Sequence, residues 1–264
     1  MTMTPLPRLA ILTVVRDDRF GLIDTHDSLR GQLGANVAWM VADGGSTDGT
    51  AEWLADNAHL PVWWRSAPDH GLYAAMNDGL DAVRCLGFSH VLFLNAGDRL
   101  AAVDSAARIV DAAGRHPGAA LLYGNALERQ RDGRILVKRA RSHRWASFGM
   151  FTHHQAMIYG VPALADLRFD PAFRIAADYA FTLAVLERGP AVRLDWPVCL
   201  FAPGGLSQRD AAAGRREQEA IRRLQLGQGR VCAAAITAAQ RVALAVRHRF
   251  PTAYAKLRFR CPET

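Results

Sequence analysis

The segment that decides the fold is AWMVADGGSTDGT, residues 38–50. Its first five residues form a short apolar run, as in a buried strand, and a glycine-rich turn opening at Asp43 separates this run from a helical pattern beginning at Thr50. A carboxylate at a strand tip, followed by glycines without bulk, can accept hydrogen bonds from a nucleoside ribose or base. The alternative is a turn in which Thr47 or Asp48 caps the next helix. The turn has neither the GxGxxG spacing of dinucleotide-binding proteins nor the Gly-Lys-Ser/Thr of a P-loop.

The same alternation of short apolar runs and helical patterns extends on both sides of this segment. We expect strands at residues 9–15, 38–42, 62–65 and 91–94, and helices at 25–33, 50–58 and 73–86. Such βαβ units predict an α/β fold with a Rossmann-like, mainly parallel central sheet. Ligands of open α/β sheets bind beyond the carboxyl ends of the strands, so the polar loops there are the candidate site.

A second polar turn ends the most hydrophobic of these strands, in VLFLNAGD at residues 91–98. A carboxylate at this position, Asp98, suits a hard cation such as Mg²⁺ or Mn²⁺, which accepts substrate phosphates and water as its other ligands. One carboxylate with one helper is therefore chemically sufficient. The alternative is a plain type I turn over residues 95–98.

With these two segments the chain resembles the family 2 glycosyltransferases of the GT-A fold, which make bacterial capsules, exopolysaccharides and lipopolysaccharides. The family's opening strand matches TVVR at 13–16, and its Asp-x-Gly-Ser-Thr-Asp-Gly-Thr loop matches residues 43–50. Residues 66–77, SAPDHGLYAAMN, closely match the string Ser-x-Pro-Asp-x-Gly-x-Tyr-x-Ala-Met-Asn of one subgroup. The family's metal-binding Asp-x-Asp motif is reduced to NAGD at 95–98, which keeps only the final acidic residue.

The resemblance implies a nucleoside-diphosphate sugar as donor, linked to UDP or GDP, and Mn²⁺ or Mg²⁺ held by Asp98. It implies that ten residues contact the donor: Thr13, Val15, Asp43, Ser46, Asp69, Gly71, Asn77, Asn95, Ala96 and Ser207. Ser207 follows two glycines in a loop that would close over the donor, unless the loop is a plain linker. Tyr73 and Met76, at helical spacing, are predicted to be core residues.

The segment IAADY at residues 175–179 resembles the part of the family that supplies the catalytic base. An inverting transfer needs one carboxylate to take the proton of the acceptor hydroxyl as it attacks the anomeric carbon. The resemblance assigns this role to Asp178. A metal-bound diphosphate already leaves readily, so no separate acid is needed. The alternative role for Asp178 is to cap the helix expected at residues 178–188, and the two roles are compatible.

His154 and Gln155 precede a strand expected at 156–159, and in the resembling group a His-Gln pair lies near the acceptor. Hydrogen bonding to sugar is therefore predicted for both, with a packed core histidine as the alternative for His154. Two adjacent histidines could also suggest zinc, but neighbouring strand residues point to opposite faces and no HExxH motif is present.

The bulk properties fit a cytoplasmic enzyme with a basic tail. The chain has 264 residues, half of them hydrophobic, four widely spaced cysteines and a net charge of +7. The charge gathers in residues 129–144 and 209–260. The run at residues 9–15 is too short for a secretory signal, and that at 231–247 is too polar to span a bilayer.

We therefore predict a GT-A domain at residues 1–208 and a basic helical C-terminal extension at 209–264. The predicted function is an inverting, metal-dependent hexosyltransferase of surface polysaccharide biosynthesis, acting on a glycan or polyprenyl-linked acceptor. The basic tail would place it peripherally on the anionic inner face of the cell membrane. The alternative is a non-catalytic nucleotide-sugar-binding or assembly protein, suggested by the reduced Asp-x-Asp motif. Nucleic-acid binding is not expected, because it rests on charge alone.

Overall fold

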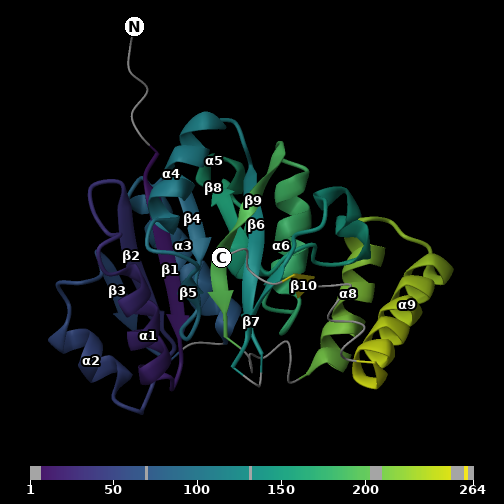
Figure 1. The fold of residues 1–264 in the computed structure, drawn as a ribbon, viewed down its shortest axis with the longest axis horizontal. Coiled ribbons are helices and arrows are strands. Elements are labelled where there is room, and N and C mark those ends of the chain that lie inside the picture. The colour runs from purple at the N-terminus through teal and green to yellow at the C-terminus, as the bar shows by residue number, and fades with distance from the viewer. Residues whose placement is uncertain (1–6, 69–70, 131–132, 203–209, 251–258, 261–264) are drawn as a thin grey trace, which may run out of the picture.

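The chain folds around one curved sheet with helices on both faces (Figure 1). The structure is a computed structural model and describes residues 7–68, 71–130, 133–202, 210–250 and 259–260. The sheet runs in the order β10-β7-β6-β8-β4-β1-β2-β3, with β9 paired to β6 and β5 paired to β9. The predicted α/β fold class is confirmed.

The first half of the sheet is parallel and follows the predicted alternation. Its strands are β1 (Leu9–Val15), β2 (Val37–Asp43), β3 (Trp63–Ser66) and β4 (His90–Phe93). They are connected by α1 (Arg19–Leu29), α2 (Thr50–Asp56) and α3 (Leu72–Cys85). Val15 pairs with Asp43, and Asp43 with Ser66, so three strands end at the same level.

The second half of the fold contains strands that run in both directions, together with the helices between them. Its elements are β5 (Arg99–Leu100), α4 (Ser105–Arg115), β6 (Leu121–Arg129), β7 (Ile135–Lys138), η1 (His143–Phe148), η2 (His154–Ala156), β8 (Met157–Gly160), α5 (Val161–Leu164), α6 (Ala177–Leu186) and β9 (Ala191–Phe201). Strand β8 lies antiparallel between β4 and β6, and β9 runs parallel to β6. Strand β9 was not expected from the sequence, because polar Arg193 and Asp195 interrupt its apolar pattern.

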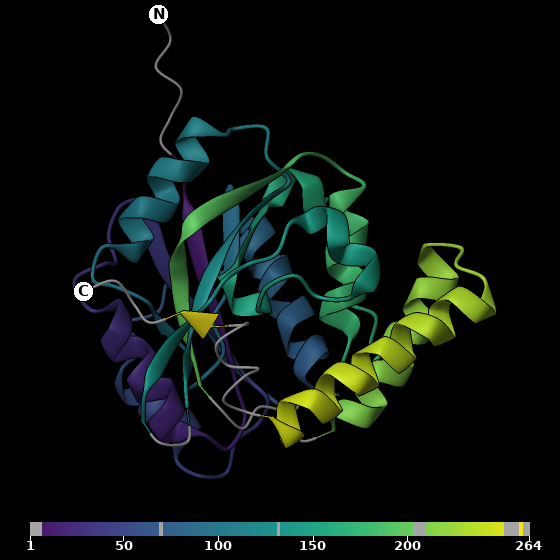
Figure 2. The same cartoon turned by 45° about the vertical axis from the view of Figure 1, so that its right-hand side comes forward.

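Two hydrophobic cores cover the two faces of the sheet. One joins α3 and α6 to the sheet, with Met76 and Tyr179 nearly fully buried. The other joins α1, α2 and α4 to the opposite face and includes Trp39. Figure 2 shows the resulting layers, with the sheet between the two groups of helices.

The C-terminal helices α8 (Ala211–Gln225) and α9 (Arg230–Arg249) lie at one side of this core, and a short strand β10 (Phe259–Arg260) pairs with β7 (Figures 1 and 2). Helix α8 packs against α6, and α9 packs against α8. The boundary predicted between residues 208 and 209 falls outside the described residues. Among the described helices, none is long and apolar enough to cross a membrane.

One predicted helix is wrong in its bounds. The helix expected at residues 25–33 starts at Arg19 and ends at Leu29, because the Asp18 side chain accepts a hydrogen bond from the Gly21 N–H and caps an earlier start. The first turn was missed because Phe20 is 85% exposed and gives no apolar periodicity facing the core.

Candidate functional site

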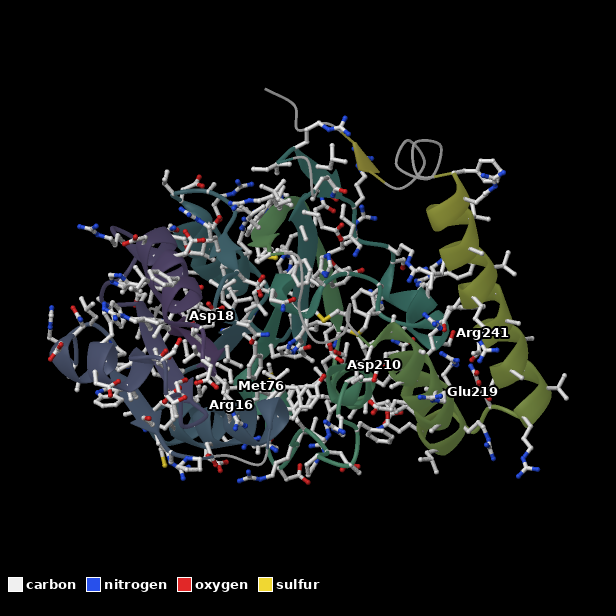
Figure 3. All side chains as sticks on the ribbon, turned by 90° about the horizontal axis from the view of Figure 1, so that it is seen from below. Arg16, Asp18, Met76, Asp210, Glu219 and Arg241 are labelled. Carbon is white, nitrogen blue, oxygen red and sulfur yellow. The ribbon has the colours of Figure 1, made fainter. Side chains whose placement is uncertain are left out.

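The polar loops after β1, β2 and β4 meet at the carboxyl edge of the parallel strands. Backbone hydrogen bonds from Gly44 to Val15 and from Ala96 to Val14 tie the loop starts together. Figure 3 looks onto this edge and shows Arg16 and Asp18 over the parallel half of the sheet, with the C-terminal helices to the other side. This is the position at which open α/β sheets bind ligands.

Asp43 sits at the tip of β2 with only 3% of its surface exposed. Its carboxylate accepts hydrogen bonds from the Ser46 N–H and hydroxyl and from the Ser66 hydroxyl, at 2.5 Å. The Ser46 hydroxyl in turn accepts the Asp17 N–H, at 2.8 Å. The structure thus brings the predicted residues Asp43 and Ser46 together and links both to the β1–α1 loop.

Further hydrogen bonds join the loop after β1 to the loop after β2. Asp17 accepts the Thr47 N–H at 2.7 Å, and Asp48 accepts the Arg19 N–H at 2.8 Å. Asp48 also accepts the Thr50 N–H at 3.1 Å, although the N-cap residue of α2 is Gly49 and neither Thr47 nor Asp48. These bonds fix the β1–α1 and β2–α2 loops against each other.

The turn at residues 95–98 is closed by the Asp98 N–H donating to the Asn95 carbonyl, at 3.0 Å. Gly97 has φ of +87°, which excludes the type I geometry and requires glycine. The Thr25 hydroxyl, from α1, bonds the Asp98 carbonyl and receives the Gly97 N–H. Asn95 Oδ1 is buried and has no hydrogen-bond partner.

Asp98 is buried, with 4% of its surface exposed. Its carboxylate accepts the Ala202 N–H, at 2.8 Å, and a hydrogen bond from the Gln155 side chain. Burial outweighs both bonds and raises the pKa of Asp98 to about 7. A cation beside this carboxylate would offset the cost of burying its charge.

Two of the predicted donor residues have their side chains engaged within the protein. The Thr13 side chain is fully buried, and its hydroxyl accepts the Trp39 Nε1–H at 2.9 Å, inside the core. The Asn77 amide is engaged at both ends by Phe169, donating to its carbonyl and accepting its N–H, each at 2.9 Å. Both side chains stabilise the fold through these hydrogen bonds. A polar residue within a sequence motif therefore need not direct its side chain toward the ligand.

The other predicted donor residues lie at the strand edge or outside the described residues. Val15 and Ala96 contribute backbone at the ends of β1 and β4. Gly71, with φ of +112°, precedes α3 at the same edge. Asp69 and Ser207 lie outside the described residues.

The predicted acceptor pair separates in the structure. His154 is stacked on Phe93, at 5.1 Å between ring centroids, and contacts Phe169 edge-on. Burial lowers the pKa of His154 to about 3, so its ring is neutral. The packed-histidine alternative is therefore favoured for His154. Gln155 bonds Asp98 instead, which places it at the predicted metal residue.

Asp178 lies in the first turn of α6, with a small part of its surface exposed. Its carboxylate accepts the Tyr179 N–H at 2.8 Å, and the Tyr73 hydroxyl lies 3.4 Å from its Oδ1. That hydroxyl also donates to the Ile175 carbonyl at 2.8 Å. Burial raises the pKa of Asp178 to about 6, near the working range of a general base.

Sequence reasoning missed a charged cluster beside Asp98. Lys138 and His153 both contact Glu128 Oε1, at 2.7 and 2.6 Å, and His153 stacks on Phe201 at 4.2 Å. Burial alone would raise the pKa of Glu128, but the bond from His153 and the charge of Lys138 lower it to about 2. Since Phe201 precedes Ala202, the cluster adjoins the residue that bonds Asp98. Its members come from three elements, so no local pattern could have revealed it.

Relatives of the chain are glycosyltransferases. No family model matches the chain. An uncharacterized glycosyltransferase of Mycobacterium tuberculosis is 28% identical over 220 residues, covering 80% of this chain and 81% of that protein. A PGL/p-HBAD biosynthesis glycosyltransferase of Mycobacterium bovis is 30% identical over 169 residues, 60% of this chain and 61% of that one.

Solved structures place the fold. S. aureus TarS 1-349 in complex with UDP aligns with a TM-score of 0.64 at 15% identity, covering 94% of this chain and 74% of that chain. The mannosyltransferase PcManGT from Pyrobaculum calidifontis, in complex with GDP-Man and Mn²⁺, aligns with a TM-score of 0.64 at 16% identity, covering 96% and 79%. The chain has the GT-A fold of these glycosyltransferases.

Proposed function

We propose that the chain transfers a hexose from a UDP- or GDP-linked sugar to a hydroxyl of a glycan or lipid-linked oligosaccharide, with inversion, in surface polysaccharide biosynthesis. The observation that carries this is Asp178, a carboxylate whose pKa burial raises to about 6 and which contacts the first turn of α3, at the edge where Asp43 and Asp98 lie. The relatives named glycosyltransferases support the reaction class.

In this proposal the donor binds along the ends of β1, β2 and β4. Asp43 is already hydrogen-bonded by Ser46 and Ser66, and accepts the ribose or base with its remaining lone pairs. The backbone at Val15, Ala96 and Gly71 borders the same space. Because these groups are fixed by the loop contacts, little ordering is required when the donor binds.

The residues at the 95–98 turn fit a divalent cation. Asp98 offers a buried carboxylate and Asn95 a buried carbonyl oxygen without partner, and oxygen ligands suit Mn²⁺ and Mg²⁺. Within the described residues no group of three or more His, Cys, Asp or Glu side chains could hold a metal, so the diphosphate would complete the shell. The cation would neutralise charge that develops on the leaving diphosphate. Gln155 would hold the Asp98 carboxylate in place.

Asp178 performs the proton transfer. The acceptor oxygen forms its bond to the anomeric carbon while the bond from that carbon to the diphosphate breaks, and Asp178 takes the hydroxyl proton. A base of pKa about 6 is ionised at pH 7 and still binds the proton strongly enough to assist attack. One carboxylate is sufficient for a single displacement with inversion.

The C-terminal helices support a peripheral membrane location on the anionic inner face of the cell. Helix α9 has no acidic residue, and its outer side exposes Val231, Val242 and Val246 beside Arg241 and Arg249. An apolar stripe flanked by arginines suits an anionic bilayer surface.

Vesicle sedimentation tests this location. The V231E/V242E double variant should lose binding to phosphatidylglycerol vesicles, whereas Val103→Glu, at a 91% exposed valine just before α4, should retain it. No binding by the unmodified chain, or equal binding by both variants, would refute the membrane role.

The test of the function is a thermal shift with UDP, GDP, CDP, TDP and ADP, each with and without Mn²⁺, followed by transfer assays with the stabilising nucleotide's sugars. Ligand binding to the folded state raises the midpoint by an amount set by concentration over affinity. A manganese-dependent rise with one diphosphate, absent in Asp98→Asn, identifies the base. No rise with any nucleotide would reject both the enzyme and a non-catalytic nucleotide-sugar-binding protein, and would leave only the assembly role.

A further inference from the structure

Helix α8 reaches the backbone that presents Asp178. The Glu217 carboxylate accepts three consecutive backbone N–H groups, from Arg174 at 3.1 Å, Ile175 at 2.9 Å and Ala176 at 2.8 Å. Successive N–H groups of this kind form a concave anion site. The contact therefore joins the C-terminal helices to the segment immediately before α6.

This contact lies immediately before α6, at its N-cap residue. Ala176 is the N-cap and has no side chain that could accept a hydrogen bond. A carboxylate near a helix N-terminus also interacts favourably with the helix dipole. Glu217 thus binds the N–H groups of the N-cap residue and of the two residues before it, and fixes the chain where it enters α6.

The packing around Glu217 is close and specific. Gly214, one turn earlier on α8, is buried, and a Cβ there would lie 3.1 Å from the Ile175 side chain. The carbonyl of the same Ile175 receives the Tyr73 hydroxyl, whose oxygen lies 3.4 Å from Asp178. One short segment is therefore held from α8 on one side and from α3 on the other.

Resting on the proposed function, we propose that Glu217 is a positioning residue for the general base. By binding the N–H groups of residues 174–176, it fixes the segment that carries the Ile175 carbonyl and leads to Asp178. Both of these groups contact the Tyr73 hydroxyl. It does not touch substrate, and it acts through this backbone and through its charge on Asp178.

The charge of Glu217 adds a second effect. Among the described residues, the ionisable groups that interact with Asp178 are Tyr73 from α3, Tyr159 from β8 and Glu217 from α8. Burial is the main cause of the raised pKa of Asp178, and the negative charge of Glu217 raises it further. Removing that charge should lower the pKa of Asp178 and move the acid limb of the rate profile to lower pH.

The experiment compares Glu217→Gln with Glu219→Gln, a matched change two residues along α8 that lies toward α9 (Figure 3). Glu217→Gln should lower kcat on the order of tenfold with little change in the donor KM, because misplacing a reacting group affects the chemical step. In this variant the fall in kcat on the acid side of the pH profile should occur at lower pH. Glu219→Gln should leave both unchanged.

A readout independent of activity accompanies this test. The ¹³C carboxyl titration of Asp178 should have a lower midpoint in Glu217→Gln than in the unmodified chain, and amide exchange at residues 174–176 should accelerate. An unchanged midpoint with unchanged exchange would overturn the proposal, even if activity fell. A shifted midpoint in a chain that transfers no sugar would instead refute the proposed function and keep the contact.

Discussion

The two carboxylates at opposite halves of the site differ in how far along the chain their partners lie. Asp43, in the parallel half, is held by Ser46 and Ser66, which are 3 and 23 residues away. Asp178, in the mixed half, meets Tyr73 across 105 residues, and its segment is held by Glu217, about 40 residues on. The parallel half is thus built from contacts between neighbouring βα units, and the mixed half from contacts between distant helices.

The largest expected effect is a loss of kcat on replacing Asp178, in the mixed half of the site. Asp178→Asn should lower kcat by about 10²- to 10⁴-fold, the usual contribution of a general base, and abolish the fall in rate of the unmodified chain below about pH 6. Stability at pH 7 should not fall, because burial of the charged carboxylate is unfavourable and Asn removes that charge. The measurement is kcat from pH 5 to 9, with thermal midpoints at each pH.

The control is Asp166→Asn, at a carboxylate 81% exposed and paired with Arg188 on the surface. It should keep the pH profile of the unmodified chain. A chain carrying Asp178→Asn that retained more than a tenth of the rate would show that another group takes the proton.

The second prediction concerns Asp98, where the two halves meet through Gln155 and Ala202. The pKa of Asp98 is about 7 folded and near 4 unfolded, so the folded state binds the extra proton between these values and stability falls as pH rises through them. Asp98→Asn removes a penalty of at most about 4 kcal/mol and should raise the melting temperature of the free chain at pH 8.

The gain should vanish at pH 4, where the Asp98 carboxyl is protonated in the unmodified chain. Differential scanning calorimetry at both pH values, without nucleotide or metal, measures it. The same variant should lose all manganese-dependent stabilisation by nucleotide. A lower melting temperature at pH 8 would mean that the Asp98 charge is compensated by groups within the protein.

The difference in contact range also explains how much could be predicted. Strands β1 to β4, the loop at Asp43 and the turn at Asp98 follow from local periodicity and turn residues. The roles of Asn77 and His154 did not, because their partners Phe169 and Phe93 are distant in sequence and only packing reveals them. Glu217 gave no signal for the same reason: a glutamate in a basic helix looks like a solvated surface residue until α6 is placed beside it.

The third prediction uses Glu128, whose partners lie at intermediate separations of 10 and 25 residues. Its pKa is about 2 folded against 4.5 unfolded, so the contribution to stability is present above pH 4.5 and is lost as pH falls toward 2. Glu128→Gln should lower the free energy of unfolding at pH 7 by up to about 3 kcal/mol, with a smaller deficit at pH 3.

Urea unfolding at the two pH values measures this difference, and Glu187→Gln, at the end of α6, is the surface control. A deficit independent of pH would assign the effect of Glu128→Gln to packing and not to charge. If the manganese-dependent binding of nucleotide also weakened, the cluster would join the two halves through Phe201 and Ala202.

The smallest expected effect concerns Thr13, in the parallel half of the site. This residue belongs to a matched family motif, but its hydroxyl contacts Trp39 in the core. Thr13→Val keeps the shape of the side chain but leaves the buried Trp39 Nε1–H without its acceptor, so the free energy of unfolding should fall by about 1–2 kcal/mol. Nucleotide affinity should stay unchanged, since the hydroxyl faces Trp39 and not the strand edge.

Ser46→Ala, which removes a bond to Asp43 at that edge, should instead weaken nucleotide binding. Calorimetric titration of both variants separates the two roles, and a loss of affinity in Thr13→Val would return this residue to the donor site.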